Sequence, residues 1–404
     1  MDQGHRISDA SDGATARALP GGRLLLGAAL LLASFNLRPA VTSLGPVLSE
    51  VMRGTGLTVA SVSVLTILPT LCFGVFAPLA PPLARRFGME RTVLAMMLAL
   101  AAGTALRWAE TPWALFAGAI LSGAAIGVVN VLLSALVKRD FPDRVALMTG
   151  LYTMVLSVGA AGAAGASAPL ALRLDSWGAS LAVWALPALL AALALLPVLP
   201  ADFRPAARRR LPSLWGNALA WQVTLLMGFQ SATTYCAFGW LAPILRDRGM
   251  SAEAAGLVLS LSILAQVGAT LGGAPFAMLW RDERAPAILT LGLGQVGFLA
   301  CLYAPLPWIW GAAVVMGVGQ GAVFSIALSV IVLRAPDTAT AAQLSGMAQA
   351  VGYLIAAAGP LLVGLAHQWT GDWRAAGPLL VLYTAIGMAG AAGAGRKRLV
   401  RPAL

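Results

Sequence analysis

Long apolar stretches, separated by short charged ones, run from Leu24 almost to the end of the chain. A helix that crosses a membrane needs about 20 apolar residues, and this pattern contains twelve stretches of that kind. Their predicted starts are Leu24, Ala60, Thr92, Trp113, Ala146, Ala179, Leu214, Ala252, Ala285, Leu306, Thr340 and Arg374. The first stretch is too long for the apolar core of a signal peptide, so we expect it to remain as an uncleaved first helix.

The composition supports an all-α integral membrane protein. Of the 404 residues, 59% are hydrophobic and 11% are charged, whereas soluble domains carry about 25% charged residues. A water-soluble fold could not hide this much apolar surface, so the bilayer is an expected partner. Cys72, Cys236 and Cys301 lie inside apolar stretches, and we expect buried thiols rather than disulfides or a metal site.

The longest polar connection, Pro200 to Pro212, separates the sixth and seventh stretches and contains four arginines. It predicts a linker between two six-helix halves. The predicted organisation is a tail at 1–22, a six-helix bundle at 23–199, a linker at 200–213, a second six-helix bundle at 214–395 and a basic tail at 396–404.

The net charge of +11 is interpreted as a topology signal rather than as a sign of nucleic-acid binding. Cytoplasmic loops of membrane proteins are enriched in Lys and Arg. If the N-terminus lies in the cytoplasm, 20 of the 27 basic residues fall on that side and six on the other. This predicts a multi-pass protein of the cytoplasmic membrane with both termini in the cytoplasm.

The two halves show a weak internal repeat. Ser34 and Pro46 lie 197 residues before Ser231 and Pro243. Gly127, Pro142 and Asp143 precede Gly321, Pro336 and Asp337 by 194 residues, in the same chain order. Parallel six-helix repeats are typical of major facilitator transporters, so the pattern indicates two pseudo-symmetric bundles.

Arg38 is the one basic residue left outside the loops, deep within the first predicted span. A charged side chain at that depth is costly and must face a partner or a wet cavity. No acidic residue lies in the middle of a predicted span, so an anionic or electron-rich substrate is a natural partner. The alternative is that Arg38 binds helix carbonyls or extends to the outer surface.

Further polar residues in the spans are substrate-binding candidates. The repeat offset of 197 pairs Tyr235 with Arg38 across the two halves, and Pro39 and Pro46 should bend or loosen the first helix. For Asn36, Asn130, Tyr152, Gln320, Gln349 and Tyr353 the alternative role is a hydrogen bond between helices. Trp240 suits shape or gating, and its alternative role is an anchor at the membrane interface. These candidates are Asn36, Thr42, Asn130, Tyr152, Gln230, Thr234, Trp240, Gln320, Gln349 and Tyr353. We expect no cofactor and no metal, because no Walker-type sequence occurs and neither histidine suits a metal site.

Several segments together resemble the cyanate and nitroimidazole transporter family of the major facilitator superfamily. They are Phe35–Pro46 (FNLRPAVTSLGP), Gly127–Leu133, Val137–Pro142, Gln230 and Ser231 followed by Tyr235 and Trp240, and Leu344–Gln349. The resemblance implies twelve helices, alternating access and a small substrate held between the halves. It also supports Asn36, Arg38, Gln230, Tyr235 and Gln349 as site residues.

The loop between the second and third helices departs from the superfamily pattern. That loop normally carries glycine, aspartate and basic residues. Here Arg86, Gly88 and Arg91 remain, but Arg85 occupies the aspartate position. The residues are interpreted as gating residues of the cytoplasmic loop, with the usual charge latch in question.

We therefore expect a monomeric secondary or facilitative transporter for a small anionic or polar-aromatic solute. Without a mid-span carboxylate, uniport, substrate exchange or symport with a proton carried by the substrate fits better than a proton relay in the core. Three alternatives stay open: a proton-coupled multidrug antiporter of the same fold, a membrane sensor and an intramembrane enzyme. The sensor would need a signalling domain and the enzyme a catalytic constellation, and neither is evident in the sequence.

Overall fold

The computed structural model describes residues 20–199, 213–336 and 338–400, and these residues form helices joined by short loops. Most of the predicted linker, and the outer parts of both predicted tails, lie outside the described residues. The first six spans contain α1 (Pro20–Phe35), α2 (Pro39–Thr42), η1 (Gly45–Val47), α3 (Leu48–Thr55), α4 (Val59–Phe76), η2 (Ala77–Leu79), α5 (Ala80–Phe87), α6 (Met89–Ala105), η3 (Leu106–Ala109), α7 (Pro112–Asp140), η4 (Pro142–Arg144), α8 (Val145–Leu174), α9 (Trp177–Ala182), α10 (Ala185–Leu195) and η5 (Leu196–Val198). The last six contain α11 (Ala218–Asp247), α12 (Ala252–Met278), α13 (Arg284–Tyr303), η6 (Leu306–Trp308), α14 (Ile309–Leu333), α15 (Thr338–Thr370), η7 (Trp373–Ala375) and α16 (Ala376–Ala394).

The helices confirm the predicted all-α membrane architecture. In the described part of the chain, 11 helical segments are long and apolar enough to cross a membrane. The twelfth is α11, whose 30 residues suffice in length but include Gln230, Thr233 and Thr234, which lower its mean hydropathy. It begins at Ala218 rather than Leu214 because the Asn217 side chain caps its first turn, accepting from Leu219 N at 2.9 Å and Ala220 N at 3.1 Å.

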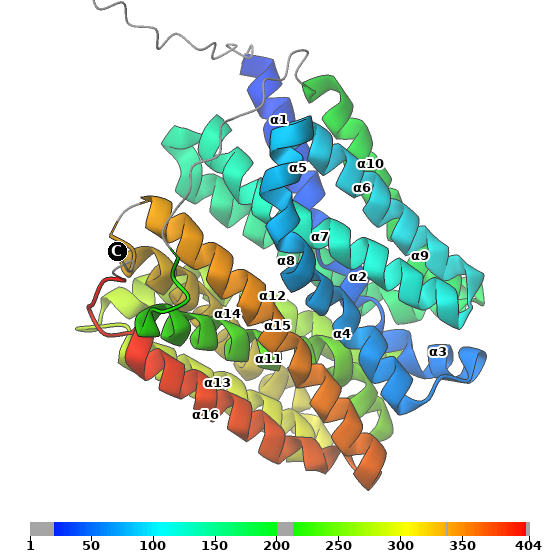
Figure 1. The fold of residues 1–404 in the computed structure, drawn as a ribbon. Helices are drawn as coiled ribbons and strands as arrows, with labels where there is room; N and C mark the ends of the chain where they lie inside the picture. The colour runs from blue at the N-terminus through cyan, green and yellow to red at the C-terminus, as the bar shows by residue number, and fades with distance from the viewer. Residues whose placement is uncertain (1–19, 200–212, 337, 401–404) are drawn as a thin grey trace, which may run out of the picture.

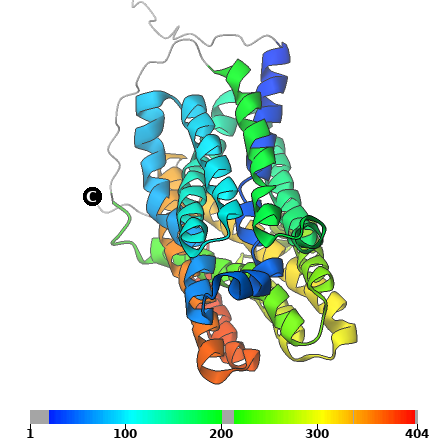
Figure 2. The same cartoon turned by 90° about the vertical axis from the view of Figure 1, so that its right-hand side faces the viewer.

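The first six spans gather on one side of the molecule and the last six on the other (Figure 1). The turned view shows the long helices running in similar directions within each group (Figure 2). The two groups pack on each other through α4 against α15 and α8 against α12. The three cysteines are free and buried, as their apolar surroundings predicted.

The two ends of the bundle differ in their content of basic residues. One end of the bundle holds the connections between helices at Gly88, 141–144, 279–283 and 334–336. Most loop arginines and lysines lie there, so we name this end the basic face. The opposite face holds the connections at 56–58, 110–111, 175–176, 248–251 and 371–372.

The first span is broken near its middle. α1 ends at Phe35, a turn follows, and α2 begins at Pro39 with Arg38 as its N-cap residue at φ −120° and ψ −33°. Proline has no N–H and clashes with the preceding helical turn, so Pro39 can begin a helix but not continue one. The break predicted at this proline is therefore present, and it places Arg38 at the start of a new helical segment.

Toward the opposite face the two groups of helices touch backbone to backbone. A Cβ atom on Gly256 in α12 would lie 2.7 Å from the Ala164 carbonyl oxygen in α8. A Cβ atom on Gly45 would lie 2.9 Å from the Phe238 carbonyl oxygen in α11. Small residues permit this approach of membrane helices, and here they close the bundle between the two groups.

Replacing Gly256 with alanine should separate α12 from α8 and destabilise this closed arrangement. Overpacking of this kind costs roughly 1–3 kcal/mol. Gly268→Ala is the matched control, because it lies on the same helix with no heavy atom within 4 Å of its added Cβ. Thermal unfolding in detergent should show a lower Tm for Gly256→Ala only. Equal Tm values for the two variants would contradict the proposed close contact.

Candidate functional site

A central cavity of about 830 Å³ lies between the two groups of helices. At the basic face it is lined by Pro81, Lys138 and Ala341, and its lining reaches inward as far as Arg38 and Phe238. The polar residues of its lining are Arg38, Asn130, Ser134, Lys138, Thr149, Tyr152, Thr153, Ser157, Gln230, Ser231, Thr234, Tyr235, Gln266, Thr270, Ser345, Gln349 and Tyr353. Both halves contribute residues to the cavity lining. The volume of the cavity suits a small-molecule ligand.

Arg38 and Tyr235 meet at the inner end of this cavity. Nη1 of Arg38 donates a hydrogen bond to the Tyr235 hydroxyl across 197 residues of sequence, so the contact joins the two groups of helices. The guanidinium carbon also lies 5.3 Å from the centre of the Tyr235 ring and 6.0 Å from that of Phe238. Stacking over aromatic faces favours a cation in a partly desolvated position. The predicted repeat partners thus face the same space and touch.

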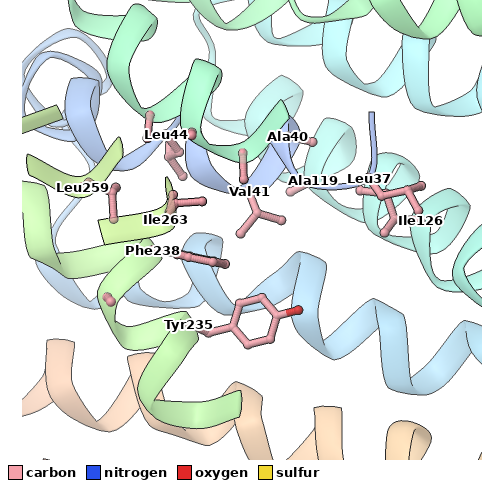
Figure 3. Close-up of a cluster of buried hydrophobic side chains, with 14 of the residues drawn as sticks. Leu37, Ala40, Val41, Leu44, Ala119, Ile126, Tyr235, Phe238, Leu259 and Ile263 are labelled. Atoms are coloured by element: carbon pink, nitrogen blue, oxygen red, sulfur yellow. The ribbon is translucent and has the colours of Figure 1, made fainter. Parts of the chain in front are cut away.

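Three further aromatic rings lie around this contact. The Tyr235 ring centre lies 5.8 Å from Phe238, 6.2 Å from Phe73 and 6.2 Å from Tyr353. Phe73 and Tyr353 are themselves 5.7 Å apart in an edge-to-face arrangement. Figure 3 shows Tyr235 and Phe238 on α11, facing the segment that carries Val41 and Leu44. We name Phe73, Tyr235, Phe238 and Tyr353 the aromatic box.

Two glutamines add amide groups to the same wall. Nε2 of Gln230 donates to Ser231 Oγ at 2.7 Å, and Nε2 of Gln349 donates to Ser345 Oγ at 2.8 Å. These bonds to neighbouring serines hold each amide in one orientation. Together with Arg38 they provide a charged group and neutral polar groups beside flat apolar rings.

The charge of the cavity wall has one sign. Arg38 and Lys138 are its basic residues, and the described lining includes no aspartate or glutamate. Arg139, the residue after Lys138, does not line the cavity and is paired with Glu90 and Asp140. A low-dielectric cavity with two cations attracts anions and repels organic cations.

Eight of the twelve predicted substrate residues line the cavity: Arg38, Asn130, Tyr152, Gln230, Thr234, Tyr235, Gln349 and Tyr353. The other four lie outside it. Asn36 donates to the Pro187 carbonyl in α10 at 3.1 Å, and Thr42 donates to the Ala160 carbonyl in α8 at 3.0 Å. Trp240 Nε1 donates to the Pro360 carbonyl at 2.7 Å, and Gln320 lies behind Gln266 at 3.5 Å. These four contact other helices, which was the alternative kept open for Asn36 and Gln320.

Sequence reasoning missed Phe73 and Phe238, because an apolar residue facing a cavity looks the same in sequence as one facing lipid. Arg107 was also one of the six basic residues counted in the outer loops, but its side chain lies inside the bundle. Arg107 is 3% exposed, because its side chain turns inward from η3 and Nη1 donates to the Ala40 carbonyl at 2.8 Å. Arg38 is therefore not the single basic side chain inside the bundle.

The loop with the unusual Arg85 is stabilised by a different ion pair. Glu90, two residues after Gly88, pairs with Arg139 at the end of α7. In the second half Glu283 pairs with Arg334 at the end of α14, at nearly the repeat offset. Gly88 itself has φ +90°, which glycine tolerates best. Each half thus has an acid–arginine pair at the basic face. The gating roles of Arg85, Arg86, Gly88 and Arg91 stay predictions.

Among the described residues, an ion pair joins the two halves near the opposite face. Glu50 of α3 accepts from both terminal nitrogens of Arg246 in α11, at 2.7 Å and 2.8 Å. Nη1 of Arg246 also donates to the Pro46 carbonyl at 3.1 Å. We name this pair the outer latch. It lies on the side where the cavity is closed.

Comparison with known proteins gives one family and several full-length relatives. A family model described as Major Facilitator Superfamily matches residues 24–360. The uncharacterized transporter YycB of Bacillus subtilis (strain 168) is 37% identical over 92% of this chain and 93% of its own. The 2-nitroimidazole transporter of Escherichia coli (strain K12) is 38% identical over 87% and 90%. The cyanate transport protein CynX of the same strain is 28% identical over 85% and 90%.

Two further similarities are a shorter sequence alignment and a structural superposition. A putative anionic 4-hydroxy-benzoate permease of Thauera aromatica is 42% identical over 31% of this chain and 70% of its own. Among solved structures, a bacterial homologue of the human lysosomal transporter Spinster superposes with a TM-score of 0.74, at 15% identity, over 96% of this chain and 100% of that one. At such low identity the superposition shows a common fold.

Proposed function

Because the chain belongs to the Major Facilitator Superfamily, we propose that its central cavity binds a small, planar organic anion and carries it across the cytoplasmic membrane by alternating access. The protein is a transporter and not an enzyme. The observation that carries the proposed substrate class is Arg38 beside the aromatic box, in a cavity whose described lining has no carboxylate.

The chemistry of the site fits a ring that bears one negative charge. A carboxylate matches the planar fork of an arginine, and the ring of the same ligand can pack against Tyr235, Phe73 or Tyr353. The amide groups of Gln230 and Gln349 suit a polar substituent on that ring. Among the relatives, those named for 2-nitroimidazole, cyanate and 4-hydroxybenzoate are consistent with a small aromatic or anionic solute.

Alternating access follows from the position of the cavity. The residues 23–199 and 214–395 would rock about the cavity as two bundles, opening it in turn to each face. The excess of basic residues at the basic face supports placing that face, and both termini, in the cytoplasm. The cavity then opens inward in this structure, and the outer latch closes it toward the outside.

One chain provides the whole cavity, which supports a monomer as the working unit. For coupling, we propose uniport, exchange or entry of a proton with the substrate, because Arg38 and Lys138 cannot serve as a carboxylate relay. Organic cations, the expected cargo of a multidrug antiporter, would meet two like charges in this cavity.

A binding screen tests the substrate class. We expect 4-hydroxybenzoate to raise the Tm of the purified protein, and its neutral amide, 4-hydroxybenzamide, to raise it much less. Organic cations of similar size serve as the second comparison. A Tm that rises with the cations and not with the benzoate would favour the multidrug antiporter instead.

A further inference from the structure

Arg107 is buried and has no carboxylate partner in the described part of the chain. Nη1 donates to the Ala40 carbonyl at 2.8 Å, and Nη2 lies 3.5 Å from Ser122 Oγ. The acid nearest in sequence, Glu110, instead accepts from Ser176 Oγ at 2.6 Å and from Gly178 N at 2.8 Å. Burying an arginine without an acidic partner costs free energy of folding. Stability alone therefore does not explain why an arginine, rather than a neutral side chain, contacts the Ala40 carbonyl.

Ala40 lies two residues after Arg38, in the four-residue helix α2 that follows the break. Such a short helix cannot hold its own position, because one turn provides few internal hydrogen bonds. Three hydrogen bonds with other spans hold this part of the first span instead. Asn36 reaches the Pro187 carbonyl before Arg38, while Arg107 binds the Ala40 carbonyl and Thr42 binds the Ala160 carbonyl after it.

Among these three contacts, the one from Arg107 is charge-assisted. It connects η3 of the third span with α2, the helix whose N-cap residue is Arg38. Hydrogen bonds from a charged donor are about twice as strong as neutral ones. We propose that Arg107 is a positioning residue: it fixes α2, and thereby holds the Arg38 guanidinium against Tyr235 in the orientation that receives an anion. This inference rests on the proposed function of the cavity.

A double-variant cycle separates positioning from general stability. With 4-hydroxybenzoate in proteoliposomes, Arg107→Gln should raise KM about tenfold while kcat stays within about twofold. In an Arg38→Gln background, the same change should have little further effect, because it acts through Arg38. Arg107→Lys, which keeps a charged donor, should recover part of the KM. Ser122→Ala, which removes the weaker contact, should behave like the wild type.

Three results would overturn the proposal: KM effects of the two substitutions that multiply in the double variant, a fall in kcat alone, or equal loss of 4-hydroxybenzamide binding. If Arg107→Gln does not fold, the Arg107→Lys variant carries the cycle in its place. A wild-type protein that neither binds nor moves 4-hydroxybenzoate would refute the proposed function, and that failure is seen before any variant is made.

Discussion

Replacing Arg38 with glutamine should weaken 4-hydroxybenzoate binding about 100-fold, measured as Kd by calorimetry on the purified protein. Truncating one partner of a buried, hydrogen-bonded charge pair costs roughly 2–5 kcal/mol, of which about 2.8 kcal/mol corresponds to that factor. The neutral 4-hydroxybenzamide should lose far less affinity, because its contacts with the aromatic box stay in place.

Two variants sharpen this prediction. Arg38→Lys keeps the charge but not the planar fork, so it should bind the anion with intermediate affinity. Tyr235→Phe removes the hydroxyl that accepts from Arg38 and keeps the ring. Its effect should be smaller than that of Arg38→Gln. An Arg38→Gln protein that binds the benzoate as tightly as the wild type would show that another group receives the negative charge.

Reversing the charge of Glu50 should shift the protein from the arrangement seen here toward one open at the opposite face. The substitution Glu50→Arg places a third cation beside Arg53 and Arg246, where the structure has two ion pairs. Like charges in contact at an interface cost several kcal/mol, so the ratio of the two arrangements should change at least about tenfold.

Pulsed electron spin resonance can follow this shift. Spin labels at Arg173 and Glu253, both exposed near the opposite face and on different halves, should report longer distances in Glu50→Arg. The exchanged pair Glu50→Arg with Arg246→Glu should restore the short distances. If the single variant keeps the wild-type distances, the outer latch does not control closure.

The sequence was enough to predict the membrane fold because the bilayer imposes a simple rule. Backbone polar groups in lipid must be satisfied within the helix, so each apolar stretch of sufficient length becomes a span. The start of α11 moved from the predicted Leu214 to Ala218, and this shift depended on the Asn217 cap. Pro39 likewise fixed the break in the first span, since its lack of an N–H acts locally.

The candidate site was predictable only where a residue was unusual for its surroundings. Arg38 and Tyr235 stood out because polar groups deep in a span need a reason to be there. Thr42 and Asn36 stood out equally but bind neighbouring helices, and the sequence contains no information on which face of a helix meets the cavity. Arg107 was misplaced because its charge lies at the end of a span, and only the fold decides whether such a side chain turns inward.

The internal repeat connects the fold with the candidate site. The pair Arg38 and Tyr235 sits at the offset of 197, and the pairs Glu90–Arg139 and Glu283–Arg334 repeat one arrangement in both halves. Weak spacing in the sequence thus corresponds to contacts that recur in space. The two halves differ at the central site itself, where one carries the cation and the other its aromatic partner.

Uptake of radiolabelled 4-hydroxybenzoate by proteoliposomes tests the central claim most directly, with wild-type and Arg38→Gln protein compared in the same experiment. We predict saturable uptake by the wild type, competition by other small aromatic carboxylates but not by 4-hydroxybenzamide, and a loss of at least about 100-fold in kcat/KM for the variant. Equal uptake by the two proteins, or competition by the amide as strong as by the acids, would contradict an anion site built around Arg38.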